Sequence, residues 1–93
     1  MKVAFELLTL FRQKAGTGRL ELEVAEAATV LEALHAAEAV LGGQALLQGE
    51  RLREGVLVFL KEAGGGTRRV FRPAEERVGR GQALVLSTAM GGG

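Results

Sequence analysis

Hydrophobic and polar residues alternate in two segments near the start of the chain. In the apolar segment Val3–Phe11, the side chains of Val3, Phe5 and Leu7 are two positions apart. In Arg19–Val24, leucine or valine alternates with arginine or glutamate. A period of two places one kind of side chain on each face of a β-strand. Because a short glycine-containing turn separates the two segments, we expect an N-terminal β-hairpin.

The next segment has the period of a helix. Thr29 and Glu32 are spaced as in a capping box, in which each side chain accepts a hydrogen bond from the other residue's backbone N–H. The glycine pair that begins at Gly42 supplies a stop signal. We therefore expect a helix over Thr29–Leu41. Its apolar stripe consists of Val30, Leu34, Ala37 and Leu41.

Three further strands are expected in the second half of the chain, after an irregular segment at 44–55. Val56–Leu60 is rich in β-branched and aromatic residues, which favour strands. Thr67–Arg72 is expected to form a short edge strand that Pro73 ends, because proline lacks a backbone N–H donor. Ala83–Leu86 is expected to form the last strand.

This order of elements predicts an α+β fold. A mixed sheet of four to five strands carries one main helix packed on one face, which buries the apolar stripe of that helix. We expect one domain over residues 1–88 and a flexible glycine-rich tail over 89–93. The segment from Ser87 onward is expected to be unpacked, since it is rich in glycine.

Composition excludes several kinds of chemistry. The 93 residues include no Cys, Asp or Asn, so disulfides, thiolate metal sites and a Ser–His–Asp triad are excluded. The formal net charge is +1, which gives no overall attraction to nucleic acid or to membranes. We expect no bound metal and no side-chain active site. Without an apparent signal peptide or membrane span, a cytoplasmic protein is expected.

Short motifs in the chain resemble those of a known family. Leu7–Arg12 is followed by Ala15-Gly16-Thr17, Thr29-Val30 opens the helix, and the chain ends in Met90-Gly91-Gly92-Gly93 after an apolar strand. Together these motifs resemble the ubiquitin-like β-grasp sulfur carriers, namely the small subunit of molybdopterin synthase (MoaD type) and its ThiS-type relatives. Two departures are the replacement of the family's Pro-Pro by Thr88-Ala89 and an apparent insertion at 64–69.

The resemblance implies a function centred on the C-terminal carboxylate of Gly93. A MoeB-type adenylyltransferase would use ATP to activate this carboxylate, and a sulfur donor would then convert it to a thiocarboxylate. A MoaE-type large subunit of molybdopterin synthase would receive the sulfur, in molybdenum cofactor biosynthesis. Gly92 would let the chain enter a narrow channel, because glycine has no Cβ. The resemblance also implies partner contacts by Met90, Gly91, Leu86 and Leu8.

Two other functions fit the same sequence. The activated Gly93 of a ubiquitin-like modifier would be joined to lysine side chains of target proteins. If the chain is instead a β-grasp binding module, its C-terminal tail takes part in no reaction. The first of these shares the activation step with a sulfur carrier, so the sequence separates the two poorly.

The remaining candidate residues favour structural roles. His35 falls on the polar side of the expected helix, and Ser87 is not part of a G-x-S-x-G motif. Leu8, Leu10, Leu57 and Leu84 are candidates for an exposed apolar sheet face. For the only basic cluster, we favour a solvated edge over a surface for an acidic protein, and we favour both of these over a nucleic-acid site. It comprises Arg68, Arg69, Arg72, Arg77 and Arg80.

Overall fold

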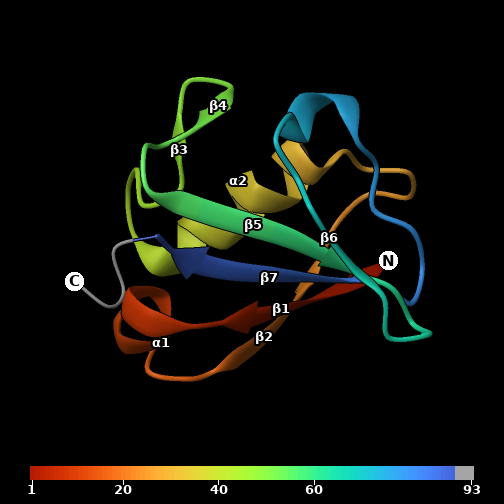
Figure 1. Ribbon diagram of the computed structural model, residues 1–93, viewed down its shortest axis with the longest axis horizontal. Coiled ribbons are helices and arrows are strands. Elements are labelled where there is room, and N and C mark those ends of the chain that lie inside the picture. The colour runs from red at the N-terminus through yellow and green to blue at the C-terminus, as the bar shows by residue number, and fades with distance from the viewer. Residues whose placement is uncertain (90–93) are drawn as a thin grey trace.

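Five strands form one mixed sheet in the order β2-β1-β7-β5-β6, in the computed structural model, which describes residues 1–89. The central strand β7 runs parallel to β1 and antiparallel to β5. Helix α2 lies across one face of this sheet, behind it in the view of Figure 1. The elements are β1 (Lys2–Leu7), α1 (Thr9–Ala15), β2 (Arg19–Glu23), α2 (Val30–Leu41), β3 (Leu47–Gln48), β4 (Arg51–Leu52), β5 (Val56–Lys61), β6 (Thr67–Arg69), the 3₁₀ turn η1 (Pro73–Glu75) and β7 (Ala83–Thr88).

The N-terminal hairpin is confirmed, but its first strand is shorter than predicted. β1 ends at Leu7 and pairs with β2 in the antiparallel sense. The expected strand residues after it instead form α1, which a left-handed Gly16 ends at φ 74°. The helical conformation turns Phe11 into the core, where only 2% of its surface is exposed. Burial of this aromatic side chain therefore overrides the strand-like pattern of the sequence.

Helix α2 has the predicted capping box. The backbone N–H of Glu32 donates to the Thr29 hydroxyl at 3.1 Å, and the Glu32 carboxylate accepts from the Thr29 backbone N–H at 2.8 Å. The apolar stripe is buried against the sheet, and Val30 and Leu34 are fully inaccessible to solvent. No helix within residues 1–89 is long and apolar enough to cross a membrane.

The capping box predicts a pH dependence of stability. Hydrogen bonds from the Thr29 backbone and hydroxyl hold the pKa of Glu32 below its ordinary value of 4.5. The stabilising contribution of the ionised carboxylate is therefore complete above pH 4.5 and is lost as the pH falls through the lowered, folded-state pKa. We expect Glu32→Gln, which keeps an acceptor but not the charge, to weaken this acid dependence in urea unfolding curves. The exposed Glu54→Gln is the matched control, and an equal change there would contradict the assignment.

The second half of the chain matches the expected strands with three differences. β6 ends at Arg69, and Val70 is buried before the chain turns into η1. The segment expected to be irregular contains the small hairpin β3–β4. β7 extends to Thr88, so the expectation that Ser87 begins an unpacked tail is wrong: Ser87 and Thr88 pair with β5.

A buried carboxylate connects α2 to the loop that follows it. Glu38 Oε2 accepts hydrogen bonds from the backbone N–H groups of Leu46 and Leu47, at 2.9 and 2.8 Å. Its side chain is 11% exposed, and His35 Nδ1 lies 3.8 Å from the other carboxylate oxygen, Oε1. Leu46 is fully buried. Glu38 thus supplies an acceptor to two backbone donors that the small hairpin does not pair.

Candidate functional site

Residues Met90, Gly91, Gly92 and Gly93, which carry most of the predicted site, lie outside the described residues. The structure describes the chain as far as Ala89, directly after β7. The part of the candidate site that the structure describes is the surface around the end of β7. Figure 1 shows this end beside α1 and the start of β5.

The end of β7 is hydrogen-bonded on both sides. Toward β1, the backbone N–H of Leu8 donates to the Leu86 carbonyl at 2.9 Å. Toward β5, the Ala89 N–H donates to the Gly55 carbonyl at 2.7 Å. Since Ala89 pairs in this way, the ordered contacts extend one residue beyond the predicted domain boundary at 88.

A threonine in a strained conformation lies beside this end. Thr9 has φ 51°, a left-handed conformation that is unusual for a β-branched residue. Its hydroxyl donates to the Leu8 carbonyl at 2.8 Å and lies 3.2 Å from the Thr88 hydroxyl, which is then the donor to Thr9. The corner between β1 and α1 is thereby linked to the last residue of β7. No local sequence pattern indicates this role of Thr9, because the apolar residues around it are typical of a strand.

Gly55 takes part in the same arrangement. Its φ of 87° is a conformation that L-residues other than glycine rarely adopt. We expect Gly55→Ala to lower the free energy of unfolding by about 1–2 kcal/mol and to speed hydrogen exchange at the Ala89 amide. Gly64→Ala is the matched control, since a Cβ at Gly64 meets no atom within 4 Å. Equal stability of the two variants would contradict a conformational role for Gly55.

An apolar surface adjoins the end of β7. Leu8 is 43% exposed and Leu10 is 50% exposed, which is high for large apolar side chains. A hollow of about 250 Å³ lies beside them. It is lined by Leu10, Phe11, Lys14, Ala45, Arg53, Glu54, Gly55, Val56 and Thr88. Exposed apolar surface bordered by charges is typical of protein interaction sites. The partner role of Leu8 stays a prediction.

The predicted partner contact by Leu86 needs correction. The side chains of Leu84 and Leu86 are fully buried, facing α2, whereas Val85 is partly exposed on the opposite face. Leu86 therefore supports the sheet from within the core, and its side chain has no surface to offer a partner. Leu84 likewise does not lie on the exposed face, whereas Leu57 is partly exposed.

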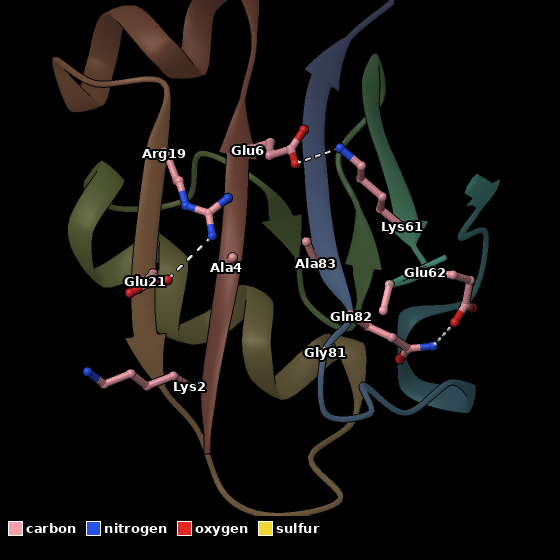
Figure 2. A pocket seen from close by; sticks show the side chains of 11 residues that line it. Lys2, Ala4, Glu6, Arg19, Glu21, Lys61, Glu62, Gly81, Gln82 and Ala83 are labelled. Carbon is pink, nitrogen blue, oxygen red and sulfur yellow. Dashed lines mark hydrogen bonds and ion pairs between the residues drawn. The ribbon is translucent and has the colours of Figure 1, made fainter. Parts of the chain in front are cut away.

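The open face of the sheet has a polar end away from the end of β7. A hollow of about 340 Å³ lies there. Figure 2 shows two of its lining residues, Ala4 and Ala83, between charged side chains. Glu6 and Lys61 form an ion pair at 3.0 Å across it. Arg19 and Glu21 form a second ion pair at 3.4 Å, and the neutral amide of Gln82 donates a hydrogen bond to Glu62 at 2.8 Å. Because this end is lined by paired charges and hydrogen-bonded polar groups, it differs from the apolar surface near Thr88.

The two remaining candidate residues, His35 and Ser87, do not belong to this site. His35 is exposed on α2, and Ser87 is paired within β7. Among residues 1–89, no group of three potential metal ligands comes together.

Comparison with solved structures defines the class of fold. A crystal structure of SAMP1 from Haloferax volcanii superposes with a TM-score of 0.76 at 21% identity and covers all of both chains. A crystal structure of the H. volcanii small archaeal modifier protein 1 gives 0.67 at 18% identity, covering 91% of this chain and 93% of that one. The chain has the ubiquitin-like β-grasp fold, as predicted.

A further similar structure is that of a complex. A chain of the Amycolatopsis orientalis BexX/CysO crystal structure gives a TM-score of 0.69 at 26% identity, covering 98% of this chain and 99% of that one. No family model and no curated protein sequence matches this chain.

Proposed function

We propose that this chain is a ubiquitin-like carrier protein that acts through the carboxylate of Gly93. The observation that carries the proposal is the position of Gly92-Gly93, four residues after a central strand whose end adjoins exposed apolar side chains. The fold that it shares with small archaeal modifier protein 1, and with a chain of the BexX/CysO complex, supports a carrier or modifier role.

The proposed chemistry begins with activation, because a carboxylate is a poor electrophile. In an adenylating partner of the MoeB type, an oxygen of the Gly93 carboxylate attacks the α-phosphorus of ATP. Pyrophosphate leaves and an acyl-adenylate remains. Hydrosulfide, the simplest sulfur donor, then attacks the acyl carbon, AMP leaves with the bonding electron pair, and a thiocarboxylate remains. Gly92 lacks a Cβ, so the backbone fits a narrow channel beside the reacting carbon.

The partner would be bound by the surface around the end of β7. Leu8 and Leu10 supply exposed apolar contacts, and hydrogen bonds at Thr88 and Ala89 hold the last described residues of the chain in place. Met90 and Gly91 would extend this contact toward the partner's active site. The finer proposal is that the acceptor of the sulfur is a MoaE-type large subunit, which makes the chain the small subunit of molybdopterin synthase.

Modification of proteins is a second candidate function. It is favoured by the fold shared with a small archaeal modifier protein. In this reaction a lysine amine of a target, rather than sulfur, attacks the acyl carbon of the activated Gly93. An isopeptide bond forms and the activating group leaves.

Mass spectrometry of the intact protein tests these proposals. The chain is incubated with a MoeB-type adenylyltransferase, ATP and a sulfur donor, and the mass before incubation verifies that Gly93 carries the free carboxylate. A mass gain equal to one oxygen-to-sulfur exchange at Gly93 supports the sulfur carrier. Lysine adducts that carry the tryptic remnant Gly81–Gly93 in cell extracts support the modifier, because Arg80 is the last basic residue of the chain. Absence of both products, with a cognate partner, overturns the carrier proposal.

A further inference from the structure

Three arginines of the basic cluster have structural roles. Arg68 forms an ion pair with Glu76, and Arg80 pairs with Glu26 at 2.6 Å. Arg77 donates a hydrogen bond to the backbone carbonyl of Ala27. These contacts fasten the segment between η1 and β7 to the rest of the domain, so they account for three of the five clustered arginines.

Arg69 and its neighbour Phe71 are arranged differently. Phe71 is 69% exposed, the highest value among the large apolar side chains of residues 1–89. The guanidinium carbon of Arg69 lies 4.7 Å from the centre of the Phe71 ring, within the range of a cation–π contact. The arginine is thereby held at the ring rather than by a carboxylate.

Phe71 borders a hollow of about 580 Å³ that lies apart from the end of β7. One side is formed by Glu50, Arg51 and Leu52 around β4, and the other by residues 71–75. Figure 1 shows both segments at the top of the view, whereas the end of β7 lies at the left. The apolar lining of the hollow consists of Leu52, Phe71, Pro73 and Ala74.

The charges at this hollow favour an acidic ligand. Arg51 and Arg72 line it together with the carboxylates Glu50 and Glu75, so the lining itself is neutral. Arg69, which stacks on the Phe71 ring without lining the hollow, brings the local excess to one positive charge. Glu75 is already 3.6 Å from Arg72. Among the described residues, Arg51 and Arg69 form no ion pair. Against the one carboxylate of the lining that also forms no ion pair within residues 1–89, Glu50, two guanidinium groups therefore remain for an incoming carboxylate, which arginine can bind through paired hydrogen bonds.

We propose that this Phe71 hollow binds a protein segment in which an apolar side chain is flanked by carboxylates. The apolar side chain would fill the space between Leu52 and Phe71, and the carboxylates would pair with Arg51 and Arg69. Aromatic and arginine side chains together are typical of the residues that dominate binding energy at interfaces. This function goes beyond activation of Gly93, and its place on the fold lets both ends of the molecule be engaged at once.

Two other occupants fit the same surface less well. A second copy of this chain would bring the arginines of one hollow against those of another. A nucleic acid would gain little, because the net excess is one positive charge and Phe71 is the only aromatic residue lining the hollow. A short acidic segment needs only one or two positive charges beside an apolar surface, which this hollow provides.

Selection from a displayed random peptide library tests the proposal with the full chain as bait. We expect enriched peptides to place Leu, Ile or Phe beside Asp or Glu. When such a peptide is added, we expect the amide chemical shifts of the protein to change at Leu52, Phe71 and Ala74. Phe71→Ser is expected to weaken binding about tenfold or more, the loss typical of a truncated interface anchor. Leu10→Ser, on the other apolar surface, is the matched control and is expected to leave peptide binding unchanged.

A charge reversal sharpens the test. Arg51→Glu is expected to shift the selected flanking residues from Asp and Glu toward Lys and Arg, while Gly93 is activated as before. The proposal is overturned if the library yields no enriched peptides, if the peptides are basic with the unaltered chain, or if Phe71→Ser binds them equally. Binding of a single-stranded oligonucleotide at Phe71, or self-association that Phe71→Ser abolishes, would overturn it in favour of another occupant.

Discussion

Deletion of Gly92 and Gly93 is expected to abolish ATP–pyrophosphate exchange by the adenylating partner and to leave the free energy of unfolding unchanged. The reacting carboxylate would be lost from the partner's active site, because the shortened chain ends two residues earlier. The hydrophobic core and the register pairs of the five-stranded sheet are formed by residues between Lys2 and Thr88. Exchange kinetics and urea unfolding of the same preparations measure the two effects.

A variant with one serine added after Gly93 is the matched control for the deletion. It keeps both glycines but moves the carboxylate one residue further along the chain, so we expect it to lose exchange as well. Retained exchange in the deletion variant would show that Gly93 is not the activated residue. Loss of folding would instead show that the last two glycines belong to the folded core.

Replacement of Glu38 by alanine is expected to lower the free energy of unfolding by about 3 kcal/mol. The carboxylate accepts from the backbone N–H groups of Leu46 and Leu47, which are buried and would lose their acceptor. A hydrogen bond to an ionised group is stronger than one between neutral groups, and a buried donor without an acceptor is costly. For a domain whose total stability is about 5–15 kcal/mol, this is a large share. Urea denaturation followed by circular dichroism measures it.

Glu38→Gln separates the acceptor from its charge. An amide oxygen can still accept one or both hydrogen bonds, so we expect a smaller loss than with alanine. Glu50→Ala removes an exposed carboxylate and is expected to change stability little. If Glu38→Ala proves as mild as Glu50→Ala, the loop after α2 does not depend on this carboxylate.

The elements that were predicted correctly are those whose own local sequence determines their secondary structure. Arg19–Glu23 alternates without interruption, so only a strand places its leucines on one face. Thr29 and Glu32 define the start of α2 through hydrogen bonds that are local in sequence. In both cases the information lies within a few residues of the element itself.

Two of the errors occur where most neighbouring residues are apolar. In Leu7–Phe11 a strand and a helix both bury leucine, and the choice depends on Phe11 reaching the core. In Ala83–Leu86 the residues on both faces are apolar, so the sequence did not indicate that Leu84 and Leu86 face α2. The contacts at Thr9, Gly55 and Thr88 join residues far apart in the chain, and no local pattern marks them.

The central place of β7 has a mechanical consequence. A pulling force applied beyond residue 89 acts first on the strand that pairs with β1 on one side and with β5 on the other. Four register pairs with β1 and six with β5 then bear the load in shear, so they must yield together rather than one after another. A molecular machine that grips the chain at this end would meet its greatest resistance at the first step of unfolding.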